Sequence, residues 1–318
     1  MDQWLTMLAA MLPVFGCIGV GLAARRLKWL TEEADSTLIT LTIRLLMPCL
    51  IIRELNTGNW VAQSSDLVYP PLAGFSLTLL GYGVCAAAVL FFGQFIGLRT
   101  PAQRRTFVLC AGMTNYGYIP IPLVKSLFTG SDSIDTLAAL LLYNVGVEMA
   151  MWTAGMMILT NQLNRRWWVG VCNPVAISIV IALVLKLTGL WSHVPAPPQK
   201  LVNWLADCAI PMALLLTGAT IADVYQKSIF RGGMGTLIGS NILRLALLPV
   251  MLLLILYFIP MSTPLHRVIA IQAAMPAAVF PIVLARHYGG DAATAVRVVL
   301  GTHALSLITL PVWLAIGL

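Results

Sequence analysis

The sequence predicts an all-α integral membrane protein with ten transmembrane helices, arranged as two inverted five-helix repeats. Three observations favour this fold class. The 318 residues are 59 % hydrophobic and only 10 % charged, whereas soluble domains average about 45–50 % apolar and about 25 % charged residues. The apolar residues form ten separate runs, and the two halves of the chain share motifs. No soluble core could bury so much apolar surface.

The ten apolar runs have the length of membrane-spanning helices, because a bilayer core of about 30 Å requires about 20 helical residues. Short polar loops separate the runs, which cover residues 3–24, 33–54, 67–97, 104–127, 134–160, 171–190, 199–221, 236–259, 267–288 and 292–317. The first run begins with an acid, Asp2, and has no basic leader. This argues against a cleaved signal peptide, so we expect a retained first span.

The distribution of Lys and Arg predicts the orientation of the chain in the membrane. Loops and span ends on the odd-numbered side hold eleven of them: Arg25, Arg26, Lys28, Arg99, Arg104, Arg105, Arg165, Arg166, Lys227, Arg231 and Arg286. The even-numbered side holds five: Arg53, Lys125, Lys186, Lys200 and Arg267. Cytoplasmic loops are enriched in these residues. Both termini are therefore predicted on the non-cytoplasmic side of a cell membrane, inner or plasma.

The net charge of +7 has an explanation in the same topology. Basic residues in cytoplasmic loops lie against an anionic lipid leaflet. We therefore expect the lipid bilayer, and no nucleic acid, to be the partner of this charge.

The two halves of the chain share motifs at nearly constant offsets. LPV at 12–14 corresponds to NPV at 173–175, and Pro48 corresponds to Pro211, with offsets of 161 and 163 residues. IPLVKSLFTGSD at 121–132 corresponds to FPIVLARHYGGD at 280–291, with an offset of 159. Five spans per unit is an odd number, so the second copy must be inverted in the membrane. The predicted repeats cover residues 1–160 and 165–318.

The fourth and ninth expected spans are both interrupted near their centres. The segment NYGYIPIP (115–122) holds two prolines and a glycine, and MPAAVFP (275–281) holds two prolines. Proline removes a backbone donor and stops a helix. Matching broken helices in inverted repeats indicate a transporter site, and half-helix N-termini attract anions. We expect a substrate to contact Asn115, Tyr116, Gly117, Pro120, Pro122, Gln272, Pro276, Ala277, Ala278 and Pro281.

Charged and polar residues inside spans are costly, and they usually have a function. Glu148 lies in the middle of the fifth span, with Asn144 one helical turn earlier on the same face. A partly buried Glu148 could carry a proton. Coordination of Na⁺ and a structural pairing with an arginine are the alternatives.

Three further residues complete the predicted polar network: Asn241, Arg244 and His303. Arg244 could bind a carboxylate with its guanidinium fork, pair with Glu148, or extend to an interface. His303 is the counterpart of Asn144 at the offset of 159 residues. A histidine could titrate near neutral pH or serve only as a hydrogen-bonding residue.

Four stretches resemble the auxin efflux carrier family of membrane transporters. They are LPVFGCIGVGLAARRLKWL followed by LLMPCLI, the Asn-Tyr-Gly…Pro break of the fourth span, AMPAAVFPIVLARHYGGD, and LPVW near the C-terminus. The resemblance covers nearly the whole chain. Members include plant auxin exporters and bacterial permeases for small carboxylates such as malonate and malate. Plant members commonly have a glycine in the ninth-span break, where this chain has Ala277 and Ala278, which argues against auxin itself.

The resemblance implies crossed, broken fourth and ninth helices. It also implies a scaffold of spans 1, 2, 6 and 7, which would form a homodimer, and a moving transport unit of spans 3–5 and 8–10. The substrate-contacting asparagine of the family corresponds to Asn115. Its two ninth-span prolines correspond to Pro276 and Pro281.

These observations predict a secondary transporter that moves a small organic anion, a mono- or dicarboxylate, by alternating access. An auxin-like aromatic carboxylate carrier, a proton- or sodium-coupled symporter and a channel-like protein are the alternatives. An enzyme is not expected, because the chain has no HExxH or G-x-S-x-G motif and its four histidines are scattered. The six cysteines lie in apolar segments and form no metal or disulfide pattern. No cofactor or metal is expected.

Overall fold

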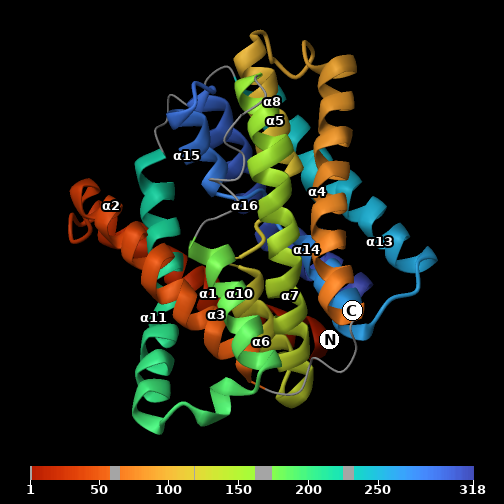
Figure 1. The fold of residues 1–318 in the computed structure, drawn as a ribbon. Helices are drawn as coiled ribbons and strands as arrows, with labels where there is room; N and C mark the ends of the chain where they lie inside the picture. Colours follow the sequence, from red (N-terminus) through yellow and green to blue (C-terminus); the bar gives the residue numbers. More distant parts are fainter. Residues whose placement is uncertain (1, 58–64, 118, 162–173, 225–232) are drawn as a thin grey trace.

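The computed structural model describes residues 2–57, 65–117, 119–161, 174–224 and 233–318 (Figure 1). Over these residues the chain is helical, apart from its connections and one isolated β-bridge. The beginning of the sixth expected span lies outside the described residues. So do four basic residues of the topology argument: Arg165, Arg166, Lys227 and Arg231.

The helices follow the apolar runs of the sequence. The first half of the chain contains α1 (Asp2–Arg26), α2 (Glu32–Leu41), α3 (Met47–Asn56), α4 (Ser65–Phe92), α5 (Pro101–Gly112), α6 (Pro120–Leu127), α7 (Gly130–Ala150) and α8 (Met156–Thr160). The second half contains α10 (Pro174–Leu187), α11 (Ala196–Val224), α12 (Met234–Ile242), α13 (Leu248–Phe258), α14 (Thr263–Ala274), α15 (Phe280–His287) and α16 (Ala292–Gly317).

Five helical segments in the described part of the chain are long and apolar enough to cross a membrane. They are Leu67–Phe92, Gly130–Thr160, Ala196–Asp223, Met234–Phe258 and Ala292–Gly317. The remaining expected spans are also helical where they are described, but they are divided or shorter. Ten complete crossings and the inverted orientation of the two halves therefore stay predictions.

Three of the long helices contain a widened π-helical turn. These turns are Thr42–Leu46 between α2 and α3, Met151–Gly155 between α7 and α8, and Leu243–Leu247 between α12 and α13. The first and third directly precede Pro48 and Pro249, each near the start of the next helix. Proline lacks an N–H and its ring collides with an earlier carbonyl. A π turn absorbs this conflict without ending the helix.

The two predicted breaks are confirmed. The helix α5 ends at Gly112 and α6 begins at Pro120, while α14 ends at Ala274 and α15 begins at Phe280. Met275 is extended, with φ −73° and ψ 141°, which is the conformation that a following proline imposes. We refer to residues 113–117 and 275–279 as the two break segments.

The helices pack closely where glycines replace larger side chains. The long α1 packs against α11, and α4 packs against α7. A Cβ atom on Gly218 of α11 would lie 1.9 Å from the carbonyl oxygen of Ile18. One on Gly146 of α7 would lie 1.8 Å from the carbonyl oxygen of Pro71. Small residues thus bring helix backbones together, as is common in membrane proteins.

Two sets of helices emerge from these contacts. The helix α3 packs on α10 and α11, and α11 packs on α1. In the other set, α14 packs on α7, α13 and α16, and α12 packs on α16. The sets meet where α1 contacts α6 and α16, and where α3 and α10 contact α7. Both cavities described below lie between these two sets.

Candidate functional site

The two break segments pair with each other through their backbones. Thr114 and Ala277 form an antiparallel β-bridge. The Asn115 N–H donates to the Pro276 carbonyl at 2.8 Å, and the Ala278 N–H donates to the Met113 carbonyl at 3.1 Å. Two N–H groups and two carbonyls of the break segments are therefore satisfied by the opposite break, far away in the sequence. This meets the requirement that irregular backbone at membrane depth finds partners within the protein.

Hydrogen bonds from side chains stabilise this backbone pairing further. The Thr114 hydroxyl donates to Gln272 Oε1 at 2.8 Å, and the Ala277 N–H donates to the Thr302 hydroxyl at 3.2 Å. Three N–H groups of the break segments, those of Asn115, Ala277 and Ala278, are thus already used. They are not free to bind an anion, so donors for a ligand must come from elsewhere, side chains included.

Arg244 holds the end of the helix that precedes the second break. Its side chain is 1 % exposed. Its Nε donates to the Met275 carbonyl at 3.0 Å, and its Nη2 donates to the Gln272 carbonyl at 3.2 Å. A cation is favourable there because the C-terminus of α14 carries partial negative charge. Among the described residues Arg244 has no carboxylate partner, so the considered ion pair with Glu148 is not formed.

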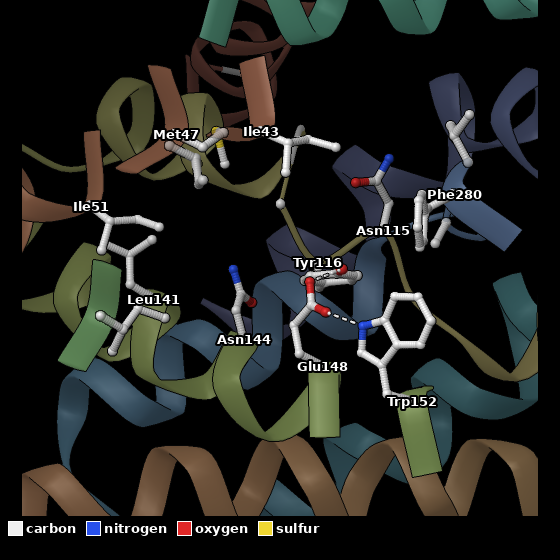
Figure 2. Close-up of a pocket in the computed structure, with 15 residues that line it drawn as sticks. Ile43, Met47, Ile51, Asn115, Tyr116, Leu141, Asn144, Glu148, Trp152 and Phe280 are labelled. Atoms are coloured by element: carbon white, nitrogen blue, oxygen red, sulfur yellow. Dashed lines mark hydrogen bonds between the residues drawn. The ribbon is translucent and has the colours of Figure 1, made fainter. Parts of the chain in front are cut away.

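A cavity of about 140 Å³ lies beside the paired break segments (Figure 2). It lies between the α2–α3 region and α10 on one side and α7 with the break segments on the other. Its wall is formed by Ile43, Met47, Ile51, Asn115, Tyr116, Gly117, Ile121, Leu141, Asn144, Glu148, Trp152, Ile179, Ala278, Val279 and Phe280. We call it the break cavity.

Two buried amide groups in the break cavity are incompletely satisfied. Asn115 is 3 % exposed and Asn144 is 6 % exposed. Within the described part of the chain, Asn115 Nδ2 and Asn144 Oδ1 have no hydrogen-bond partner. An unpaired buried polar group costs about 1–3 kcal/mol. One donor and one acceptor are therefore available to a ligand in this cavity.

Glu148 supplies a carboxylate to the cavity wall, the single one among the described lining residues. Tyr116 Oη donates to Glu148 Oε1 at 2.5 Å, and Trp152 Nε1 donates to Oε2 at 3.0 Å (Figure 2). Trp152 follows Glu148 by one helical turn, which places both side chains on one face. The cavity therefore combines a carboxylate with two amides and aromatic rings.

The structure brings together some of the predicted site residues and separates others. Asn115, Tyr116, Gly117, Ala278, Asn144 and Glu148 line the break cavity. The prolines Pro120, Pro122 and Pro281 lie in the first turns of α6 and α15, and Gln272, Pro276 and Ala277 lie in or behind the backbone pairing. Asn241 and His303 line a different cavity.

Sequence reasoning missed most of the apolar wall. Ile43, Met47, Ile51 and Ile179 approach from α2–α3 and α10, and nothing in an apolar membrane sequence marks such residues. Trp152 could have been found, because it lies four residues after Glu148 on the same face.

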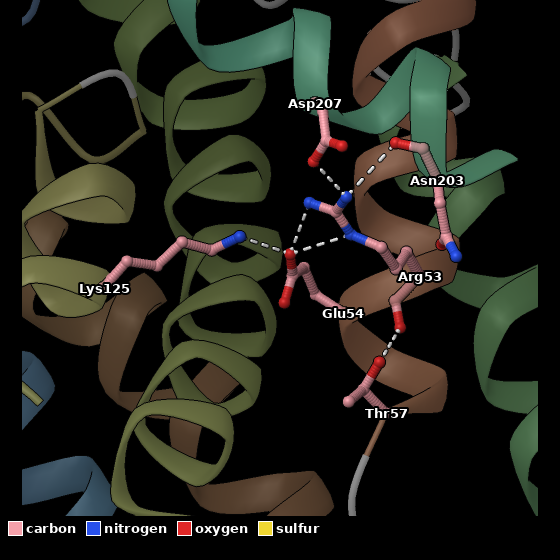
Figure 3. Close-up of polar contacts among 6 residues, drawn as sticks. All are labelled: Arg53, Glu54, Thr57, Lys125, Asn203 and Asp207. Atoms are coloured by element: carbon pink, nitrogen blue, oxygen red, sulfur yellow. Dashed lines mark hydrogen bonds and ion pairs between the residues drawn. The ribbon is translucent and has the colours of Figure 1, made fainter. Parts of the chain in front are cut away.

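An ionic cluster joins α3, α6 and α11 (Figure 3). Lys125 Nζ of α6 lies 2.5 Å from Glu54 Oε1 of α3. Arg53 contacts Glu54 at 2.8 Å and Asp207 of α11 at 2.6 Å. Glu54 lies one turn beyond Ile51 of the break cavity. We call these four residues the ionic cluster.

A family model described as "Membrane transport protein" matches residues 6–166 and 158–314. The chain belongs to the auxin efflux carrier family. Membership identifies a multi-pass membrane transporter, in agreement with the apolar helices. No curated protein matches the chain.

Family membership confirms the resemblance drawn from the sequence motifs. It agrees with the expectation that the protein is a transporter and not an enzyme. The four stretches that carried the resemblance lie within the matched residues.

Proposed function

We propose that the protein is a secondary transporter of a small organic anion, a mono- or dicarboxylate, which it binds in the break cavity. The observation that carries this proposal is the pair of buried, incompletely satisfied amides, Asn115 and Asn144, beside the paired breaks of two helices. A carboxylate oxygen would accept from Asn115 Nδ2. A hydroxyl or a protonated carboxyl of the same ligand would donate to Asn144 Oδ1.

The size and lining of the cavity support a small ligand. Its volume of about 140 Å³ corresponds to about ten water-sized positions. Isoleucine and leucine side chains would contact the carbon skeleton, and Phe280 and Trp152 form an edge-to-face pair at one end. These rings also favour the alternative ligand, an aromatic carboxylate. Arg244 does not contact the ligand in this proposal. It stabilises the end of α14, which precedes the second break segment.

Glu148 makes a coupled cation part of the proposal. Two negative charges in one water-poor cavity repel strongly, because Coulomb energies grow as the dielectric constant falls. Binding of the anion would therefore be favoured by a proton on Glu148, or by a sodium ion beside it. We propose the proton over the sodium ion, because the hydrogen bonds from Tyr116 and Trp152 to the two carboxylate oxygens leave fewer lone pairs to coordinate Na⁺.

Alternating access would arise from motion between the two helix sets. We propose that α1, α2, α3, α10 and α11 form the scaffold, which would also dimerise, and that the remaining helices move with the break segments. The Glu54–Lys125 pair links α3 to α6, and therefore links the scaffold to the moving unit. On the proposed topology this link closes the cavity on the non-cytoplasmic side.

The proposal is tested by the thermal stability of the purified protein against a panel of anions. Malonate, malate and indole-3-acetate would each be tested with and without Na⁺ and at two pH values. An anion at about one hundred times its dissociation constant should add about 2.7 kcal/mol of stability. The Asn115→Ala variant should lose this stabilisation, while Asn203→Ala, an exposed position on α11, should keep it.

The outcomes separate the parts of the proposal. Stabilisation by one anion that disappears in Asn115→Ala supports both the substrate class and the site. Stabilisation that survives in a folded Asn115→Ala protein contradicts the site. Absence of any shift across the panel contradicts binding of these carboxylates.

A further inference from the structure

A second cavity, of about 610 Å³, lies between α1 and α11 on one side and α12 and α16 on the other. Apolar side chains form most of its wall, among them Phe15 and Ile18 of α1 and Ile221 of α11. Its two polar side chains among the described residues are Asn241 and His303. No charged side chain of the described residues lines it. We call it the α1–α16 cavity.

His303 presents a single acceptor to this cavity. The residue is 6 % exposed, and its Nδ1 lies 2.8 Å from the Val299 carbonyl. A carbonyl can only accept, so Nδ1 carries the proton and Nε2 carries the lone pair. In the described part of the chain Nε2 has no partner. The helix α16 thus fixes the tautomer and leaves one acceptor unused near its middle.

Asn241 presents a second unused acceptor from another helix. Its Oδ1 is buried and lacks a hydrogen-bond partner within the described ranges. Gly301 leaves this side of the cavity open, because a Cβ atom there would lie 3.0 Å from Leu237 Cγ and 3.6 Å from Asn241 Nδ2. Two separate helices therefore each place a residue with an unsatisfied acceptor at the wall of one apolar space.

The chemistry of the wall defines the ligand. Two acceptors without a neighbouring cation would repel a carboxylate, so this cavity does not suit the anion proposed for the break cavity. They match a hydroxyl or N–H donor, and the apolar wall matches a hydrophobic body. Satisfying buried acceptors recovers the cost of leaving them unpaired.

We propose that the α1–α16 cavity binds a neutral amphiphile, with its hydroxyl or N–H donating to one of the two acceptors, His303 Nε2 or Asn241 Oδ1. The bound molecule would contact α1 and α11 together with α12 and α16. If the proposed division into scaffold and moving unit holds, such a ligand would wedge between the two and slow transport.

The binding test uses 4-phenylphenol and its methyl ether, 4-methoxybiphenyl, which replaces the donor proton by a methyl group. Binding would be measured as saturable thermal stabilisation of the full chain in lipid nanodiscs. The phenol should bind about five- to tenfold more tightly than the ether, as expected for the loss of a buried hydrogen bond. At least one of the variants His303→Leu and Asn241→Leu, the one that removes the acceptor used by the phenol, should reduce this preference.

A matched control separates this proposal from the transport proposal. Asn115→Ala should lose stabilisation by the carboxylate and keep the preference for the phenol. The second-cavity proposal is overturned if phenol and ether bind equally, if neither binds saturably, or if the preference persists unchanged in His303→Leu and Asn241→Leu. The effect of bound phenol on the transport rate tests the proposed wedge between scaffold and moving unit, and not the binding itself.

Discussion

Asn115 and Asn144 are two residues whose side chains lower the stability of the folded protein. Both are buried and both keep an amide atom without a partner among the described residues. A leucine at either position would leave no buried polar atom unpaired, and the folded protein would be more stable. Polar groups that a fold leaves unsatisfied in a cavity are groups that a ligand can satisfy.

Replacing Asn144 by leucine, whose side chain has the same number and branching of heavy atoms, should therefore have opposite effects on stability and binding. We expect the ligand-free protein to gain about 1 kcal/mol in unfolding free energy, because an unsatisfied acceptor is removed. We expect anion binding to weaken about tenfold. Thermal denaturation with and without the anion measures both. A variant that loses stability and retains affinity would contradict the assigned role.

Glu148 should control the pH dependence of transport. Protonation removes the negative charge that repels the anion, so uptake in the native protein should increase as pH falls. Glu148→Gln keeps a neutral side chain at every pH, and its uptake should be nearly independent of pH. Initial rates of labelled anion uptake between pH 6 and 8 measure this. Glu33→Gln, at an exposed position of α2, should behave like the native protein.

The sequence identified the polar half of the break cavity but not its apolar half. Asn115, Asn144 and Glu148 stand out because polar side chains inside a membrane are rare. Ile51 and Ile179 cannot be distinguished from the many other apolar residues without knowing which helices meet. Asn241 and His303 were grouped with Glu148 because all are polar, whereas the structure assigns them to a separate cavity.

At the scale of elements, the two broken helices were predictable because proline acts locally. Pro120 begins α6 and Pro276 follows the end of α14, as expected for a residue that lacks an N–H and disfavours a helical residue before it, although α1, α4, α11 and α16 continue through prolines of their own. The pairing of the break segments was not predictable in the same way, because Thr114 and Ala277 are far apart in the chain. The π turns before Pro48 and Pro249 were also missed, although the same chemistry produces them.

The link between α3 and α6 yields a prediction about access to the break cavity. Removing the cation with Lys125→Met should weaken the closure proposed for the non-cytoplasmic side. Partly exposed ion pairs contribute about 0.2–1 kcal/mol, so the open population should rise by at most about fivefold. The measurement uses a cysteine introduced at Ile121 in a background without native cysteines. Its rate of labelling from the non-cytoplasmic side by a membrane-impermeant reagent should rise in Lys125→Met.

A control for this experiment is available on α11. Lys200 lies over the Trp204 ring and outside the ionic cluster, so Lys200→Met should leave the labelling rate unchanged. An equal increase in both variants would show that the loss of any surface charge suffices, and the Glu54–Lys125 link would then have no special role.

At the scale of the whole molecule, the proposed motion between the two helix sets predicts the behaviour of a carrier and not of a channel. A carrier must return its empty site across the membrane, and exchange of one anion for another can be faster than this return. Unlabelled anion inside vesicles should therefore accelerate the uptake of labelled anion several-fold. This counterflow is measured in proteoliposomes of the full chain. Uptake that neither saturates nor responds to internal anion would indicate a channel.

The backbone pairing of the break segments also has an evolutionary consequence. Hydrogen bonds between Asn115 N and Pro276 O, and between Ala278 N and Met113 O, involve no side chain. Substitutions on these segments can change what the cavity recognises without dismantling the framework that holds it. Related chains could therefore diverge in substrate by a few side-chain changes while the geometry of the two breaks is inherited unchanged.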